Sequence, residues 1–126
     1  MVLQDKGRVL VVDDDRDICA NIKDILDDLG YLTDTAHDGP SALNLIQQGA
    51  YDVALLDFKM PGMNGVELYR EIKKLRPDVP AIMITAHAES AGLQQAIDAG
   101  TRHILRKPVD FACLLPMIDR CATPGI

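Results

Sequence analysis

Short runs of apolar residues recur at regular intervals along the chain, and each run predicts a buried β-strand. Most of them are almost continuously apolar, which is typical of parallel strands that are covered on both faces. The five runs are RVLVVD (8–13), YLTDTA (31–36), DVALLD (52–57), PAIMIT (80–85) and RHILRK (102–107).

Stretches with the spacing of an amphipathic helix separate these runs. The clearest spans residues 15–29, where aliphatic residues follow one helix face and Gly30 comes next as a C-terminal cap. Asp38 and Pro40 predict the start of a second helix, because proline suits a first helical turn. It is expected to run to Gly49. Three more helices are expected, from Asn64 or Gly65 to Leu75, over residues 90–99, and from Asp110 onward.

Strand and helix therefore alternate along the chain without an internal repeat, a low-complexity segment or a linker. Such alternation predicts a doubly wound α/β fold, in which five helices cover both faces of a five-stranded parallel sheet. We expect a single domain over residues 1–126. Its core would run from about residue 8 to residue 121, with a tail or the start of a linker over 122–126.

Composition narrows the class of protein. The chain has 126 residues, of which 48% are hydrophobic and only 4% aromatic, so the core must be aliphatic. A net charge of -6 argues against direct nucleic-acid binding by this domain. No apolar run approaches the roughly 20 residues of a membrane span, so no membrane contact is expected. Three cysteines without metal or disulfide spacing indicate a reduced, cytoplasmic protein.

Chemically active residues stand at the ends of four of the five predicted strands. The second strand ends in Ala36, which contributes nothing obvious. The carboxyl ends of parallel strands meet at one sheet edge, where functional groups gather in folds of this kind. The residues expected there are Asp13 with Asp14 and Asp15, Asp57, Thr85, and Lys107 followed by Pro108.

The acids at this edge need a counter-charge, because neighbouring carboxylates repel each other and raise each other's pKa. Mg²⁺ would supply it, since this ion prefers oxygen ligands from one or two carboxylates, water and phosphate. Asp14 and Asp57 suit direct ligation, and Asp13 suits an outer role through water. The backbone carbonyl of Lys59 is a further candidate ligand. A plainer role at the N terminus of the first helix is expected for Asp15 and for Asp17.

The other two groups suit a phosphoryl group. Lys107 can pair with Asp57 or with an incoming phosphate, and Thr85 offers a hydroxyl donor to a phosphoryl oxygen. With a metal ion, such groups can hold a phosphoryl group during its transfer to a carboxylate, which depends mainly on positioning and charge.

Four motifs occur together and in order: VLVVDDD (9–15), DVALLDFKMPGMNG (52–65), IMITAHA (82–88) and ILRKP (104–108). With them the chain resembles the receiver domain of bacterial two-component response regulators, from Arg8 to about Cys121. The resemblance implies a flavodoxin-like sheet with strand order 2-1-3-4-5. It also implies a Mg²⁺-dependent phosphoacceptor rather than an enzyme. A histidine kinase or histidine phosphotransfer protein would phosphorylate it to control an unknown partner or output domain.

The resemblance gives each site residue a role. Asp57 is implied to be the phosphoacceptor, Thr85 the switch hydroxyl and Lys107 the lysine on the phosphate. It also implies a cis peptide bond between Lys107 and Pro108, a geometry that has a low energetic cost only before proline. The cis bond would aim Lys107 into the pocket. The implied Mg²⁺ site comprises Asp13, Asp14, Asp57 and the carbonyl of Lys59.

Two features are unusual for this family. Ile104 stands where the family usually carries a switching aromatic residue, so the usual coupling is in doubt. Pro116 lies inside the last predicted helix, where proline removes a backbone donor, so we expect a kink or a late start there. This region commonly forms the dimer face of the family, which leaves formation of a homodimer open.

Lys59 and His87 place basic groups near the phosphoryl site and are expected to alter the rate of dephosphorylation.

Two other functions compete with the switch. A haloacid-dehalogenase-like phosphatase also uses an aspartate nucleophile, but its motif requires Thr or Val where this chain has Asp17. A receiver-like docking module that works without phosphorylation is the second alternative, and Ile104 and Pro116 keep it open. The sequence names neither the cognate kinase nor the output.

Overall fold

A computed structural model of the chain describes residues 6–86, 94, 97–101 and 103–122. These residues form five strands, each followed or preceded by a helix that returns the chain to the same end of the sheet. The elements are β1 (Arg8–Val12), α1 (Arg16–Asp28), β2 (Leu32–Ala36), α2 (Gly39–Gln48), β3 (Val53–Asp57), α3 (Gly65–Leu75), β4 (Ala81–Thr85), β5 (His103–Arg106) and α5 (Phe111–Ala122).

The strands form one parallel sheet in the order β2-β1-β3-β4-β5, so the predicted fold class and strand order are confirmed. From β1 the chain adds β2 on one side and then β3 on the other, so the direction in which strands are added reverses between the neighbouring strands β1 and β3. Val12 is in register with Leu56, and Asp57 is in register with Ile84. The carboxyl ends of β1, β3 and β4 therefore lie at one level, where a doubly wound sheet opens a crevice.

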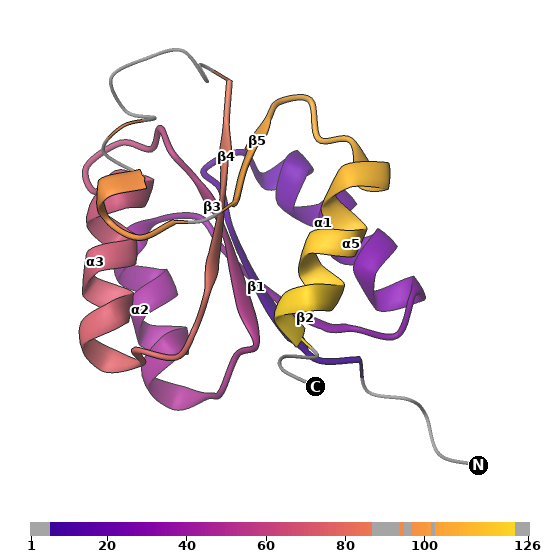
Figure 1. Ribbon diagram of the computed structural model, residues 1–126, viewed down its shortest axis with the longest axis horizontal. Helices are drawn as coiled ribbons and strands as arrows, with labels where there is room; N and C mark the ends of the chain where they lie inside the picture. Colours follow the sequence, from indigo (N-terminus) through magenta and orange to yellow (C-terminus); the bar gives the residue numbers. More distant parts are fainter. Residues whose placement is uncertain (1–5, 87–93, 95–96, 102, 123–126) are drawn as a thin grey trace.

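Two hydrophobic layers hold the helices to this sheet. Figure 1 shows α1 and α5 on one side and α2 and α3 on the other. Successive strand residues point to opposite faces, so Leu10 and Leu56 pack in the layer under α2 and α3. Val11 and Leu55 pack in the layer under α1 and α5. Burial of both faces explains why β1, β3 and β4 are almost continuously apolar.

Side chains cap the helices where the sequence predicted. Asp15 accepts hydrogen bonds from the backbone of Asp17 and Ile18 at the start of α1. Asp38 caps α2 in the same way. Asn64 forms a reciprocal capping box at the start of α3, in which its side chain accepts from Glu67 N and the Glu67 side chain accepts from Asn64 N.

Of the two helices predicted nearest the C terminus, the structure describes only the last in full. The helix expected over residues 90–99 lies largely outside the described residues, so the described part has four helices. The last helix begins at Phe111, directly after Asp110, so the late start considered from Pro116 is wrong. It stays helical on both sides of Pro116. Ala112 and Pro116 are both exposed, so water can bind the carbonyl that the proline leaves without a helical donor.

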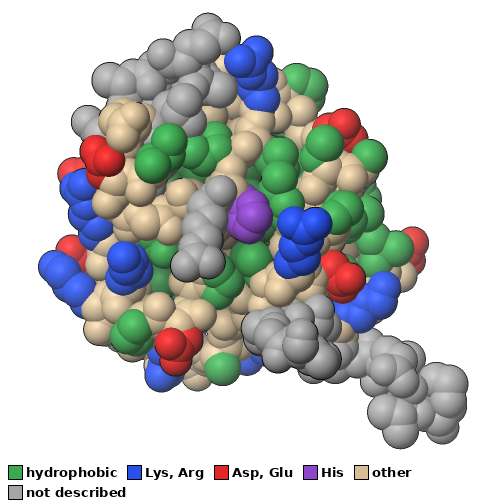
Figure 2. Space-filling model, viewed as in Figure 1, with side chains coloured by type: hydrophobic (Ala, Val, Ile, Leu, Met, Phe, Trp, Pro, Cys, Tyr) green, Lys and Arg blue, Asp and Glu red, His purple; other side chains and the backbone are tan. Residues whose placement is uncertain are grey.

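The surface carries both signs of charge. On the face seen in Figure 2, acidic and basic side chains alternate around apolar ones. Over the part of the chain that the structure describes, no helix has the length and the apolar character needed to cross a membrane.

Candidate functional site

Three carboxylates meet at the carboxyl edge of the sheet. Asp13 directly follows β1 and Asp57 ends β3, and their side chains are only 4% and 5% exposed. Asp14 is exposed at the rim. One oxygen atom from each of the three lies within 4.8 Å of the others. The structure thus brings together the three acids that the sequence predicted to share one site.

Lys107 reaches this cluster from the loop after β5. Its Nζ lies 3.0 Å from Asp13 Oδ2 and 3.3 Å from Asp57 Oδ1. Its backbone N–H donates to the carbonyl of Thr85 at 2.8 Å, which ties the loop to the end of β4. The peptide bond between Lys107 and Pro108 is cis. The lysine therefore bridges the two buried carboxylates with a single charge.

Burial and charge together change the protonation of these groups. Burial, with the nearby charge of Asp13, raises the pKa of Asp57 to about 6, although Lys107 and the Lys59 backbone N–H act in the opposite direction. For Lys107, burial acts to lower the pKa, but hydrogen bonds and charges from Asp13 and Asp57 outweigh it and raise the pKa. One ammonium group does not fully compensate the carboxylates around it.

The donor set of this cluster fits a hard divalent cation. Its members are carboxylate oxygens, which Mg²⁺ and Ca²⁺ prefer over nitrogen or sulfur ligands. Exposed Asp14 leaves one side open for water, while buried Asp13 and Asp57 supply fixed charge. Asp13, Asp14 and Asp57 could therefore hold a metal ion.

The other predicted residues surround this cluster. Thr85 ends β4 and is 5% exposed, one position beyond the level of Asp57 in the sheet register. Lys59 lies two residues after Asp57 with an exposed side chain, and its backbone N–H acts to lower the pKa of Asp57. Ile104 is half-buried against the layer under α2 and α3. His87 lies outside the described residues.

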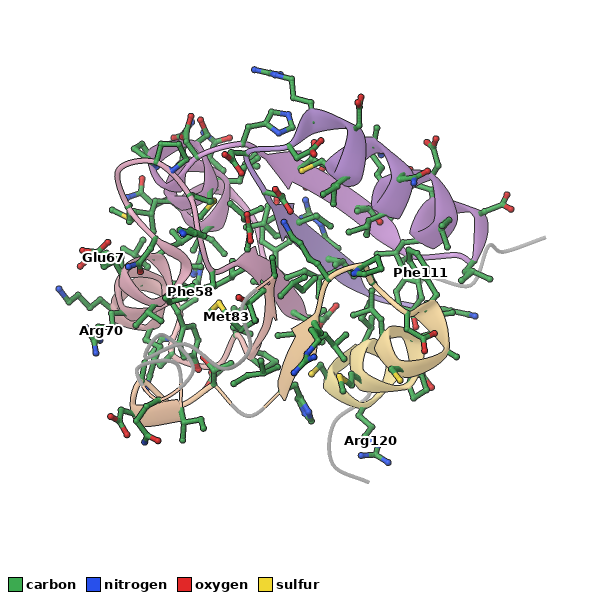
Figure 3. The ribbon with its side chains drawn as sticks, turned by 90° about the horizontal axis from the view of Figure 1, so that it is seen from above. Phe58, Glu67, Arg70, Met83, Phe111 and Arg120 are labelled. Atoms are coloured by element: carbon green, nitrogen blue, oxygen red, sulfur yellow. The ribbon has the colours of Figure 1, made fainter. Side chains whose placement is uncertain are left out.

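The chain after β3 passes unusually close to the helix that follows it. A Cβ atom at Gly65 would lie 2.5 Å from the carbonyl oxygen of Asp57 and 2.8 Å from Met83 Sδ. Gly65 N also donates to the Phe58 carbonyl at 2.9 Å. Figure 3 shows Phe58 and Met83 on the sheet side of α3, whereas Glu67 points away from the core. Glycine at the first position of α3 thus lets the helix approach the backbone of Asp57.

Two side chains near the site were given no role by the sequence. His37 Nδ1 lies 3.2 Å, and Cys19 Sγ 3.3 Å, from the backbone carbonyl oxygen of Asp13. His37 directly follows Ala36, the end of β2, which was expected to contribute nothing. The pairing of β2 with β1 would have pointed to this position, because His37 follows a strand end next to Asp13.

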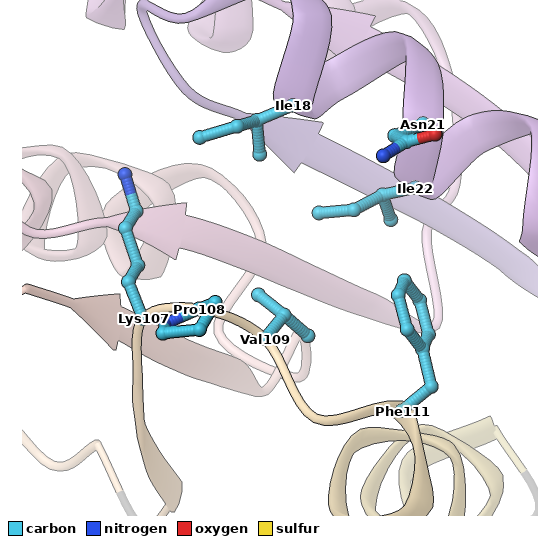
Figure 4. Close-up of a pocket in the computed structure, with 7 residues that line it drawn as sticks. All are labelled: Ile18, Asn21, Ile22, Lys107, Pro108, Val109 and Phe111. Atoms are coloured by element: carbon cyan, nitrogen blue, oxygen red, sulfur yellow. The ribbon is translucent and has the colours of Figure 1, made fainter.

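A cavity of about 460 Å³ opens beside Lys107, between α1 and the start of α5. Figure 4 shows Ile18 and Ile22 of α1 opposite Val109 and Phe111, with Lys107 at one end. The cavity is mostly apolar, and Lys107, which contacts Asp13 and Asp57, forms part of its lining.

Comparison with known proteins identifies the architecture. Residues 9–119 match the family model described as the response regulator receiver domain. The chain belongs to this family. The receiver domain is the phosphoacceptor domain of two-component response regulators and is a regulatory module rather than a classical enzyme.

Relatives of this receiver domain have different lengths. Chemotaxis protein CheY-3 of Vibrio cholerae is 34% identical over 125 residues, which cover 94% of both chains. A response regulator receiver protein of Anaeromyxobacter sp. is 37% identical over 87% of this chain. The chain spans only 46% of that protein and 23% of the transcriptional regulatory protein ZraR of Klebsiella oxytoca, to which it is 34% identical.

Solved structures agree with the fold. A CheY-like receiver domain protein from Methanospirillum hungatei superposes with a TM-score of 0.86 at 35% identity, covering 91% of this chain and 92% of that one. Response regulator TrrA of Thermotoga maritima, solved in complex with Mg²⁺-BeF, gives a TM-score of 0.81 at 33% identity. It covers 90% of this chain and 97% of TrrA.

Proposed function

We propose that this receiver domain is a phosphorylation switch whose phosphoacceptor is Asp57. A histidine kinase or a histidine phosphotransfer protein would supply the phosphoryl group in a Mg²⁺-dependent reaction. One observation carries the proposal: the Asp57 carboxylate is buried at a strand end, 3.3 Å from Lys107 and within 4.8 Å of the carboxylates of Asp13 and Asp14.

In the proposed reaction, an oxygen of ionised Asp57 attacks the phosphorus atom of the phosphohistidine. The phosphorus–nitrogen bond breaks as the new oxygen–phosphorus bond forms, and the nitrogen keeps the bonding electrons. Because the transferred group passes through a loose transition state, the protein acts mainly by positioning and by charge. The product is an acyl phosphate on Asp57.

Each neighbouring residue then has a defined task. Lys107 would leave its contact with the Asp57 carboxylate and pair with a phosphoryl oxygen. The Thr85 hydroxyl, buried at the end of β4, would donate to another phosphoryl oxygen. When bound, Mg²⁺ supplies charge stabilisation for the phosphoryl oxygens. Asp13, Asp14, Asp57 and the carbonyl of Lys59 would hold it.

Partner and output belong to the same proposal. The apolar cavity beside Lys107 gives a phosphodonor domain a surface to rest on within reach of Asp57. ZraR is a transcriptional regulatory protein of which this chain matches less than a third, so an attached output domain is one way for the switch to be read. A separate partner protein is the other. A cytoplasmic location, which the cysteine pattern predicted, stays a prediction.

The test is intact mass after incubation with acetyl phosphate, which donates a phosphoryl group without a kinase. We expect wild type to gain one phosphoryl group in Mg²⁺, and to gain none in EDTA. Asp57→Asn should gain none in either condition. A folded wild-type protein that takes up no phosphoryl group in Mg²⁺ would overturn the switch. The remaining reading would then be a receiver fold kept for docking alone.

A further inference from the structure

Every polar atom of Asp13 has a partner. Its backbone N–H donates to the Ala36 carbonyl at 3.1 Å. Its Oδ1 accepts from Asp15 N at 2.9 Å, and its Oδ2 pairs with Lys107 at 3.0 Å. The remaining atom, the carbonyl oxygen, is approached by two side chains from different elements. Asp13 is therefore held at all four polar positions.

The two side chains on the carbonyl are His37, from the loop after β2, and Cys19, from α1. The His37 Nδ1 distance is 3.2 Å and the Cys19 Sγ distance is 3.3 Å. A carbonyl oxygen only accepts hydrogen bonds, so Nδ1 of His37 must carry a hydrogen. Cys19 is 1% exposed, and its thiol is a weak donor, so His37 provides the stronger of the two bonds.

This carbonyl belongs to the peptide group that joins Asp13 to Asp14. Donors from two directions fix the rotation of that peptide plane, and the plane sets the direction in which the chain leaves β1. Asp14 has an exposed side chain for which no hydrogen bond is seen within the described part of the chain. Its carboxylate is consequently aimed by the backbone alone, whereas Asp13 and Asp57 are held by Lys107.

We propose that His37, assisted by Cys19, is a positioning residue that fixes the peptide between Asp13 and Asp14 and thereby sets the affinity of the carboxylate cluster for a divalent cation. The inference rests on the proposed Mg²⁺ site. It follows the general behaviour of metal sites, where loss of a group that orients the ligands typically weakens metal affinity by about 10–100-fold.

The test compares Mg²⁺ binding by wild type, His37→Ala and His37→Asn, followed by amide chemical shifts in an NMR titration. His37→Ala removes the donor and should weaken Mg²⁺ binding by about tenfold. His37→Asn places an amide N–H near the position of Nδ1, so it should stay close to wild type. His103→Ala is the matched control, because His103 is also half-buried but begins β5, at the edge of the sheet away from the carboxylates. It should leave the affinity unchanged.

A second readout needs no metal. In EDTA, the ¹³C shift of the Asp13 carbonyl should move in His37→Ala and stay in place in His37→Asn, while urea unfolding of the two variants remains similar. The inference is overturned if His37→Ala binds Mg²⁺ as tightly as wild type, or if His37→Asn is as weak as His37→Ala. Absence of Mg²⁺ binding by wild type would instead remove the proposed function, and the inference with it.

Discussion

A buried carboxylate at the end of β3 lowers the stability of the fold that carries it. Asp57 is 5% exposed, and burial raises its pKa to about 6. The folded protein therefore holds this proton more tightly than the unfolded chain does. The free energy of unfolding falls as the pH rises from about 4 to about 6, because ionised Asp57 is favoured in the unfolded chain.

Asp57→Asn should accordingly stabilise the metal-free protein at neutral pH. The expected gain is about 1–2 kcal/mol, less than the full pKa difference implies because Lys107 loses a charged partner. Near pH 4, where the wild-type carboxyl is protonated, the gain should largely disappear. Urea unfolding in EDTA at the two pH values measures both. A less stable Asp57→Asn at neutral pH would mean that the Lys107 pairing outweighs burial.

The basic residues Lys59 and His87, the second of which lies outside the described residues, are predicted to alter how long the phosphoryl group stays. Lys59 is exposed two residues after Asp57, where its ammonium can change how water reaches an acyl phosphate. Lys59→Ala and His87→Ala should therefore alter the lifetime of the phosphorylated protein by several-fold. The decay of the phosphorylated mass after removal of the donor measures this lifetime. Lifetimes equal to that of wild type would rule out the modulating role.

Single residues show where sequence reasoning works and where it stops. Asp13, Asp57 and Lys107 could be placed together because strand ends of a parallel sheet share one edge. The pairing of β2 with β1 could have placed His37 near Asp13, but not its contact with the Asp13 carbonyl. Cys19 could not be placed, since a cysteine in an apolar helix pattern looks like ordinary packing. Their role depends on two side chains from different elements meeting one carbonyl oxygen, and no spacing in the sequence encodes that distance.

At the scale of elements, the position of α3 depends on how closely it approaches β3. A Cβ at Gly65 would meet the Asp57 carbonyl oxygen at 2.5 Å, and this backbone atom cannot move without shifting the site. Gly65→Ala should cost about 1–3 kcal/mol of stability, as overpacking commonly does, and should slow phosphorylation by acetyl phosphate. Urea unfolding and the rate of mass gain measure the two effects.

Gly39→Ala is the matched control. Gly39 also opens a helix, but the three atoms nearest to its added Cβ all belong to the Met63 side chain, with Sδ at 2.7 Å, and this flexible side chain can shift where a backbone carbonyl cannot. Stability and phosphorylation should change much less than in Gly65→Ala. Equal effects in the two variants would contradict the argument that the backbone of Asp57 is what Gly65 accommodates.

The boundaries of most elements could be predicted because local chemistry marks them. Asp15, Asp38 and Asn64 cap their helices with side-chain hydrogen bonds, and such residues are recognisable in sequence. Pro116 was harder, because its cost depends on whether the freed carbonyl faces water. Ala112 and Pro116 are both exposed, so α5 continues through the proline.

At the scale of the whole molecule, a cation that binds only the folded protein must stabilise it. Mg²⁺ at tenfold excess over its dissociation constant should add about 1.4 kcal/mol and raise the melting temperature by several degrees. Asp13→Asn should reduce this gain, whereas Asp28→Asn, an exposed acid at the end of α1, should keep it. Thermal unfolding with Mg²⁺ and with EDTA measures the difference. Equal gains in both variants would exclude the cluster as the binding site.

A homodimer, if it forms, is expected to use the edge of the sheet at β5 and the helices beside it. Ile104 is half-buried on β5, where the family usually carries an aromatic residue, so movement of a large ring cannot transmit the signal. The homodimer through this region stays a prediction. Size comparison of the free and phosphorylated protein tests it.

The central claim is that Asp57 receives the phosphoryl group, and locating the modified residue tests it most directly. Borohydride reduces an aspartyl phosphate to homoserine, which peptide mass spectrometry then assigns to one position. After incubation with acetyl phosphate and Mg²⁺ and then reduction, homoserine should be found at position 57. It should be absent from a sample incubated with EDTA. Homoserine at position 13 or 14 instead, or none in a protein that is folded and carries Mg²⁺, would contradict the account.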